Sequence, residues 1–164
     1  MIKIEPAKQG WILKTEQLIP APLHETFEFF ADAGNLERIT PPFLNFQILT
    51  PLPVDMQEGA LIDYQIRLHL VPIKWKTEIS LWQPPHAFVD QQLRGPYKKW
   101  IHTHTFEPRG SETMVYDHVE YDVPGGSLVH HLMVKKDLLK IFQYRHDSLE
   151  KIFREERQPQ EVLA

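Results

Sequence analysis

The stretch "VPGGSLVHHLMVKKDLLKIFQYRHDSLEKIFRE", residues 123–155, decides the fold, because it contains the longest helical pattern of the chain. After the turn residues Pro-Gly-Gly, apolar side chains recur at near-helical spacing with charged residues between them. These apolar positions are Leu128, Leu132, Leu139, Phe142, Leu149 and Phe153. With Ser127 as the N-cap, the pattern predicts an amphipathic helix over 127–155, whose apolar stripe another layer must cover.

The chain before this helix is dominated by strand patterns that Pro- and Gly-containing links separate. We expect strands at 11–19, 43–50, 60–71, 73–83, 86–93, 98–107 and 112–123. Two short helices are expected after the first of these strands, at 20–32 and 33–40. Residues 1–10 are predicted to form a loose arm. Because the links between strands are short, the strands are expected to form an antiparallel meander.

This order of elements predicts an α+β fold, in which a seven-stranded curved antiparallel sheet wraps around the long C-terminal helix. A sheet of this width curls because its strands twist. The gap between a curled sheet and one helix is a natural ligand cavity. We expect one ligand-binding domain over 1–164, with its core at 11–155, because 164 residues suffice for a core and an internal pocket.

Composition narrows the classes of partner and location. The net charge of −4 favours no nucleic-acid partner, and the lack of cysteine excludes disulfides and thiolate metal sites. The N-terminal sequence "MIKIEPAKQG" has no signal-peptide pattern, and no apolar run is as long as a membrane span. We therefore expect a soluble, cytoplasmic protein with no integral membrane association.

The stretch "GPYKKWIHTHTFEP", residues 95–108, carries two histidines in the middle of a predicted strand. Alternation places His102 and His104 on one face with Trp100. Such a pair can be a metal site, an acid/base pair, the polar part of a ligand cavity, or simply buried. His-x-His is a known metal-ligand spacing, but Glu107 points to the opposite face and no other acid is seen to converge. The sequence therefore predicts no metal site.

The hairpin that follows gives His102 a carboxylate partner. An even loop at 108–111 places His102 directly opposite Asp117, whereas an odd loop places it opposite a neighbour of Asp117. We prefer the even register because it keeps the apolar side chains of 112–123 on the face of His102. Asp117 is then the only carboxylate expected on that face, and a buried carboxylate needs a donor.

The pair of His102 and Asp117 has two possible chemical roles. In the preferred interpretation, the two side chains satisfy each other's hydrogen bonds inside an apolar cavity and orient a ligand. An imidazole that a carboxylate orients is also the start of a general base, able to remove a proton next to a carbonyl. Arg145 could pair with Asp117 or with a ligand carboxylate, although a solvent-exposed charge is expected for it.

The element order resembles the helix-grip fold of the START-related, pollen-allergen-like superfamily (SRPBCC), in particular its polyketide cyclase/dehydrase and lipid-transport branch. The segments that carry the resemblance are "FFADAGNLERITPPFLNFQILTP", "GPYKKWIHTHTFEP", "VYDHVEYDVPGG" and "IFQYRHDSLEKIF". They are similar to a subgroup of bacterial proteins without an assigned activity, whose domain sometimes accompanies sugar-nucleotide epimerase-like proteins. The resemblance implies a hydrophobic ligand in the cavity.

The leading hypothesis is binding of a hydrophobic small molecule, such as a lipid, an isoprenoid or a polyketide-like compound, without a cofactor. The expected ligand-binding residues are Tyr64, Ile66, Leu68, Trp75, Trp100, His102, His104, Asp117 and Phe142. One alternative is a cyclase or dehydratase that uses His102 and Asp117 as an acid/base pair. Another is a regulatory module that works with an epimerase-like partner. A monomer or weak homodimer is expected.

Overall fold

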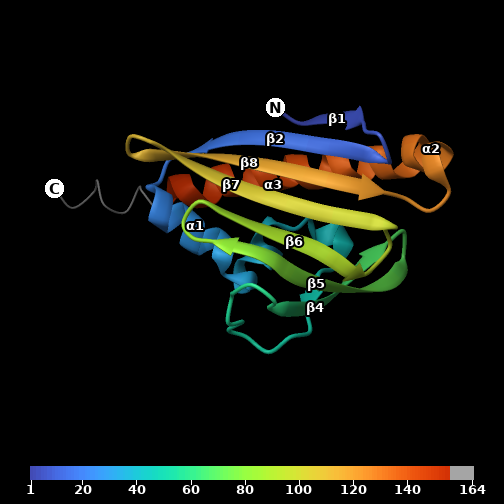
Figure 1. The fold of residues 1–164 in the computed structure, drawn as a ribbon, viewed down its shortest axis with the longest axis horizontal. Helices are drawn as coiled ribbons and strands as arrows, with labels where there is room; N and C mark the ends of the chain where they lie inside the picture. The colour runs from blue at the N-terminus through green and yellow to red at the C-terminus, as the bar shows by residue number, and fades with distance from the viewer. Residues whose placement is uncertain (156–164) are drawn as a thin grey trace.

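In a computed structural model, which describes residues 1–155, a curved antiparallel sheet of eight strands packs against a long C-terminal helix (Figure 1). The strands follow the order β1-β2-β8-β7-β6-β5-β4-β3 across the sheet. Their bounds are β1 Lys3–Pro6, β2 Trp11–Ile19, β3 Gln47–Ile48, β4 Leu61–Leu68, β5 Val71–Gln83, β6 Ala87–Arg94, β7 Lys99–Arg109 and β8 Glu112–Asp122. The predicted α+β fold, with a sheet gripping a long helix, is confirmed.

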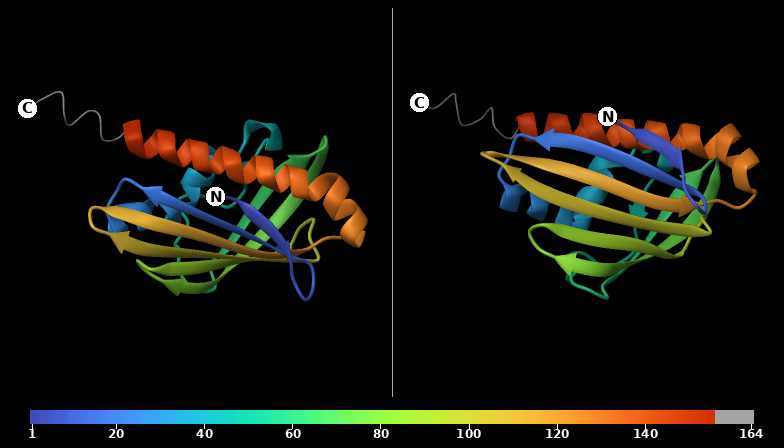
Figure 2. Two further views of the ribbon diagram at one scale, coloured as in Figure 1. Left: turned by 90° about the horizontal axis from the view of Figure 1, so that it is seen from above. Right: turned by 45° about the horizontal axis from the view of Figure 1, so that its top comes forward.

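The helical segments occupy two places in the chain. Between β2 and β3 lie α1 Leu23–Ala31 and the 3-10 turns η1 Ala33–Ile39 and η2 Pro42–Leu44. After β8 come α2 Gly126–Val129, the π-helical segment η3 His130–Val134 and the long helix α3 Lys135–Glu155. Figure 2 shows α3 lying across one face of the curved sheet. The remaining part of the expected domain, residues 156–164, lies outside the described residues.

The strand count differs from the expected seven because the N-terminal arm is ordered. Within residues 1–10, β1 pairs antiparallel with β2 and adds a strand at the edge of the sheet. The strand expected at 43–50 is shorter, since Pro41 and Pro42 start the turn η2 and only Gln47–Ile48 pair with β4. Asn45 ends η2 in the left-handed conformation, with φ 43°, which also breaks the extended pattern.

The apolar stripe of the final helix is shorter than predicted. Leu128 and Leu132 are each 70% exposed, whereas the buried positions of α3 are Leu138, Phe142, Leu149 and Phe153. The π-helical turn of η3 has more residues per turn than an α-helix, so the positions before it do not continue the stripe of α3. The prediction of a helix was right, and the inclusion of Leu128 and Leu132 in its buried face was wrong.

His130 holds the start of the helix against the sheet. Its ring stacks on Trp11 with centroids 3.8 Å apart, and its Nε2 is hydrogen-bonded to the Tyr121 hydroxyl at 2.9 Å. The side chain is buried, and burial, followed by the charges of His131 and Lys135, lowers its pKa to about 4. A charged imidazole at this position is therefore costly.

Stability is expected to fall as the pH drops from about 6.5 to about 4, by up to about 3 kcal/mol from His130 alone. In this window the unfolded chain binds a proton at His130 and the folded chain does not. Urea unfolding at several pH values measures the drop. His130→Gln keeps a partner for Tyr121 but cannot titrate, so its drop should be smaller, whereas exposed His118→Gln should match the wild type. An identical drop in His130→Gln would contradict the assignment.

The hydrophobic core lies between the sheet and the helices, in separate clusters. One packs α1 and the end of α3 on the sheet, around Phe27 and Phe106. A second joins β2 and β8 to the first half of α3, around Tyr121 and Leu138. A smaller third one lies under η1 and the strands β4 and β5, around Ile62. The clusters support both ends of the helix and leave space between them for a pocket.

The turn between β4 and β5 adopts a strained conformation. Leu68 pairs with Val71, and the two turn residues His69 and Leu70 both have positive φ, 47° and 72°. A two-residue hairpin turn of this kind favours glycine at the second position. Leu70 is 85% exposed at the tip of this turn, so the strand expected at 60–71 ends earlier, at Leu68. The chain therefore carries a bulky residue in a conformation that costs free energy.

Leu70→Gly is expected to raise the free energy of unfolding by about 0.5–1 kcal/mol. Glycine removes the strain of the left-handed conformation in the folded chain, and this gain is larger than the free energy by which the added flexibility of glycine stabilises the unfolded chain. Chemical denaturation measures the change. Leu70→Ala removes the same exposed apolar surface but keeps a Cβ, so it should give no such gain. Equal stabilisation by both variants would show that strain is not the cause.

Candidate functional site

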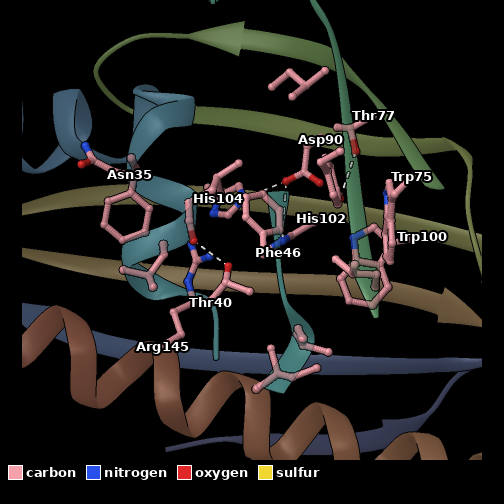
Figure 3. Close-up of a pocket in the computed structure, with 18 of the residues that line it drawn as sticks. Asn35, Thr40, Phe46, Trp75, Thr77, Asp90, Trp100, His102, His104 and Arg145 are labelled. Carbon is pink, nitrogen blue, oxygen red and sulfur yellow. Dashed lines mark hydrogen bonds and ion pairs between the residues drawn. The ribbon is translucent and has the colours of Figure 1, made fainter. Parts of the chain in front are cut away.

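A pocket of about 190 Å³ lies between the concave face of the sheet, the helix α3 and the segments α1, η1 and η2. Its walls are mainly apolar, and strands β4, β5, β6 and β7 form its base. Figure 3 shows its polar side chains near the middle, with Trp75 and Trp100 on one side and Asn35 and Arg145 on the other. The hollow expected under the long helix is thus present.

The residues expected to bind a ligand are brought together around this pocket, with one exception. Those that line it are Tyr64, Ile66, Leu68, Trp75, Trp100, His102, His104 and Phe142. Asp117 does not line the pocket. It is 5% exposed and lies behind the two histidines, on β8. Its contact with a ligand would be indirect, through the imidazoles.

Asp117 contacts one ring nitrogen of each imidazole. His102 Nε2 lies 2.9 Å from Asp117 Oδ1 in a hydrogen bond, and His104 Nδ1 lies 3.0 Å from the same oxygen. The other oxygen, Oδ2, accepts a hydrogen bond of 2.9 Å from the Thr15 hydroxyl. The two rings face each other with centroids 3.8 Å apart. Asp117 therefore orients the His102 ring through a hydrogen bond, whereas its contact with His104 Nδ1 is close but does not have hydrogen-bond geometry.

The register of the β7–β8 hairpin differs from the predicted one by two residues. His104, not His102, lies directly opposite Asp117, and His102 lies opposite Val119. The loop contains only Gly110 and Ser111, since Arg109 already pairs with Glu112. A shift of two residues keeps every side chain on its predicted face, so the contact between His102 and Asp117 forms diagonally.

Asp90 is the functional residue that sequence reasoning missed. It lies on β6 opposite His102, and its Oδ2 is 2.9 Å from His104 Nε2 and 3.6 Å from His102 Nδ1. The expectation that Asp117 is the only carboxylate on this face is therefore wrong. Asp90 lines the pocket and is 19% exposed. We call Asp90, His102, His104 and Asp117 the polar centre.

Arg145 on α3 reaches the polar centre instead of solvent. Its Nη2 lies 3.6 Å from Asp117 Oδ1, its side chain is 12% exposed, and its guanidinium lies 5.2 Å from the centroid of the Phe30 ring. The expectation of a solvent-exposed charge is therefore wrong. The neighbouring carboxylates and the aromatic ring offset the cost of burying the guanidinium.

The charges of the polar centre shift the pKa values of its members. Burial would raise the pKa of Asp117, but Arg145 and the two imidazoles hold it well below its usual value. Burial lowers the pKa of His102, and the neighbouring His104 lowers it further. Burial would also lower the pKa of His104, but its close contacts with the carboxylates of Asp117 and Asp90 outweigh burial and raise the pKa. The pKa values of the two neighbouring imidazoles are therefore shifted in opposite directions.

Further polar groups belong to residues that line the pocket away from this centre. Trp75 is 6% exposed, and its buried Nε1 has no hydrogen-bond partner within residues 1–155. Tyr64 stacks on Trp75 with centroids 5.6 Å apart, and its hydroxyl lies 3.3 Å from Thr77 Oγ1. A buried donor without a partner is costly unless a ligand or water accepts from it.

The wall opposite the sheet was also not predicted from the sequence. It comes from α1, η1, η2 and the residues that follow them, including Phe30, Leu36, Thr40 and Phe46. Their helical and turn patterns are visible in the sequence, but the patterns do not tell which side chains face the sheet. Only the packing of these short segments under α3 brings them to the pocket.

Comparison with known families gives one extended match. The sequence model of the family described as "Polyketide cyclase / dehydrase and lipid transport" matches residues 19–143. This range contains all of the polar centre and most of the pocket wall. A comparison with curated proteins gave no match.

Solved bacterial structures share the fold at low sequence identity. A protein from Mycobacterium smegmatis aligns with a TM-score of 0.67 and 13% identity, over 94% of this chain and 100% of that chain. A protein from Arthrobacter aurescens aligns with a TM-score of 0.70 and 11% identity, over 91% of each chain. A protein from Thermus thermophilus aligns with a TM-score of 0.58 and 22% identity, over 88% of this chain and 94% of that chain. At these identities the likeness supports the fold alone.

No helix within residues 1–155 is both long enough and apolar enough to cross a bilayer.

Proposed function

Because the chain belongs to the polyketide cyclase/dehydrase and lipid transport family, of the START-related (SRPBCC) type, we propose that it binds a compact, mainly apolar molecule carrying an oxygen function. Ligand binding in general is the role that the family and the fold support. The observation that carries the finer proposal is a mainly apolar pocket whose lining includes the polar residues Asp90, His102 and His104, together with Trp75, whose buried Nε1 has no hydrogen-bond partner within residues 1–155. Apolar burial supplies affinity, and these few polar groups supply orientation.

The volume of the pocket favours a small ligand. A cavity of about 150 Å³ in another protein binds benzene, so about 190 Å³ suits one or two rings or a short branched chain. A long acyl chain would extend beyond it. Among the three predicted classes, a polyketide-like aromatic or a short isoprenoid therefore fits better than a whole lipid.

Trp75 and the polar centre are suited to bind the ligand's oxygen. Trp75 Nε1 can donate a hydrogen bond for which residues 1–155 supply no acceptor. A carbonyl or hydroxyl oxygen near this atom would relieve the cost of the buried donor. The stacked ring of Tyr64 beside Trp75 offers a flat apolar surface to the rest of the molecule.

Binding of 2-naphthol, followed by tryptophan fluorescence and calorimetry, tests this proposal. Ile66→Trp fills the pocket and should weaken binding at least about tenfold, which corresponds to about 1.4 kcal/mol. Leu93→Trp adds the same ring at a site outside the pocket that is 51% exposed, so it should leave the affinity unchanged. Native mass spectrometry of protein purified from its own host should in addition reveal a retained small molecule.

The contribution of the unused donor can be measured separately. Trp75→Phe should weaken the binding of 2-naphthol about 3- to 10-fold more than the binding of naphthalene. Only 2-naphthol has an oxygen that can accept a hydrogen bond from Nε1. Equal losses for both compounds would contradict a role of Nε1. Unchanged 2-naphthol affinity in Ile66→Trp would contradict the pocket as the binding site.

A second candidate function is proton abstraction by His102. The observation that favours it is the pKa of His102, which burial lowers, together with its hydrogen bond to Asp117. A neutral, oriented imidazole is a general base. Hydrogen–deuterium exchange at the carbon next to the carbonyl of 2-tetralone measures this step. A cyclase or dehydratase should accelerate the exchange and lose at least about 100-fold in His102→Ala, whereas a binding protein should give no acceleration.

A further inference from the structure

Three possible metal-ligand atoms converge at the base of the pocket. Asp90 Oδ2 lies 2.9 Å from His104 Nε2 and 3.6 Å from His102 Nδ1, and one ligand atom from each of the three residues lies within 4.8 Å of the others (Figure 3). The residues come from the neighbouring strands β6 and β7, so the sheet itself fixes their positions. From this arrangement we infer that Asp90, His102 and His104 bind a divalent transition-metal ion.

The two distances from Asp90 to the imidazoles suit such an ion, and the two histidine nitrogens lie within 4.8 Å of each other. Ligands bound at about 2.1 Å lie about 3.0 Å apart at a right angle and about 3.4 Å apart at the tetrahedral angle. The two observed distances, 2.9 Å and 3.6 Å, are close to this range. Two imidazoles and one carboxylate on one side of an ion leave its other side open toward the pocket. This donor set suits Zn²⁺, Fe²⁺, Co²⁺ or Mn²⁺.

The second, independent observation is the role of Asp117. In metal sites a carboxylate usually accepts a hydrogen bond from the ring nitrogen that does not bind the metal. Asp117 Oδ1 contacts His102 Nε2 and His104 Nδ1, so the opposite nitrogens of both rings are the ones directed at Asp90. Thr15 and Arg145 in turn hold Asp117. Asp117 thus has the position of an outer-layer carboxylate, hydrogen-bonded to His102 and 3.0 Å from the nitrogen of His104 that does not face Asp90.

The charges of the site also suit a divalent ion. Asp90 and Asp117 together balance two positive charges, and Arg145 adds one more positive charge nearby. An ion at this place therefore favours an anionic oxygen, such as a phenolate or an enolate, as its next ligand. The preference for an anionic oxygen rests on the proposed function, whereas binding of the ion does not.

Titration of chelator-treated full-length protein with Co²⁺ tests the inference with the metal alone. We expect one Co²⁺ per chain, detected by calorimetry and by visible absorption bands of a nitrogen- and oxygen-ligated ion. Asp90→Asn and His104→Gln should each weaken binding by more than about 100-fold, and Asp117→Asn by about 10- to 100-fold. His69→Gln is the control, because His69 forms another histidine–carboxylate pair, with Asp137 at 2.8 Å, on the exposed surface. It should leave the affinity unchanged.

Thermal unfolding keeps the test valid if a variant is less stable. Co²⁺ should raise the unfolding temperature of the wild type and of His69→Gln, but not that of Asp90→Asn. The absence of a 1:1 complex in the wild type, or unchanged affinity in both Asp90→Asn and His104→Gln, would overturn the inference. Binding of 2-naphthol by the chelated protein is a separate readout, so failure of the metal site and failure of the proposed function are distinguishable.

Discussion

Asp117→Asn is expected to lower the free energy of unfolding by about 3–5 kcal/mol, the effect of breaking a buried network of charges. Asp117 is 5% exposed and contacts Thr15, both imidazoles and Arg145. An amide has the shape of the carboxylate but not its charge. It leaves the guanidinium of Arg145 buried without its nearest counter-charge on the sheet, and this unpaired charge is the main cost.

The pH dependence of this effect follows from the pKa of Asp117, which lies well below its unfolded value. A carboxylate with a lowered pKa stabilises the fold above the unfolded pKa of about 4, and this stabilisation is lost as the pH falls toward the folded pKa. The difference between wild type and Asp117→Asn should therefore be full at neutral pH and shrink below about pH 4.

Denaturant unfolding of matched variants measures the contribution of Asp117. Asp63→Asn is the control, because Asp63 forms an exposed ion pair with Lys76 at 3.1 Å and its side chain is 44% exposed. Exposed pairs contribute about 0–1 kcal/mol, so this variant should stay within that range. Similar losses in the two variants would mean that Asp117 is not the centre of a buried network.

Phe106→Ala is expected to lower the free energy of unfolding by a similar amount, about 3–5 kcal/mol, because it leaves a cavity in the core. Phe106 is 1% exposed, and its ring lies 5.3 Å from that of Phe27 and 5.2 Å from that of Phe30. These two residues belong to α1, so Phe106 joins this helix to the sheet. Loss of the ring should loosen α1 as well as remove apolar burial.

Chemical denaturation, with hydrogen exchange of the α1 amides, measures both consequences. Phe43→Ala removes the same side chain at a site that is 56% exposed, so its effect should stay within about 0.5 kcal/mol. Faster exchange in α1 is expected for Phe106→Ala only. Unchanged exchange in α1 would contradict the view that Phe106 anchors this helix.

The period of two along each strand explains how much of the site could be predicted from the sequence. It assigns a face to every residue of a regular strand, so Tyr64, Trp100 and His102 could be placed toward the helix without knowing any distance. An error of two residues in the register leaves these faces unchanged. This is why the contact between His102 and Asp117 formed although the predicted pairing was wrong.

Asp90 could not be placed in the same way, because its neighbours depend on how β6 pairs with β7. The connection between these strands is not a tight turn, and β5 shifts its register on β6 twice, so the alignment cannot be counted from the loops. The buried positions at the start of the final helical segment were mispredicted for a different reason, because a π-helical turn cannot be recognised from the spacing of apolar residues. Both errors concern irregular backbone, where a fixed period gives no information.

The polar centre and the wall that faces it have different structural origins. Asp90, His102, His104 and Asp117 stand on the adjacent strands β6, β7 and β8, where the hydrogen-bonded ladder sets their spacing. The facing wall includes the short turns η1 and η2. Insertions and deletions are tolerated in such turns but not inside a ladder. Changes in η1 and η2 can therefore reshape the pocket wall of this protein without disturbing the arrangement of acids and imidazoles on the sheet.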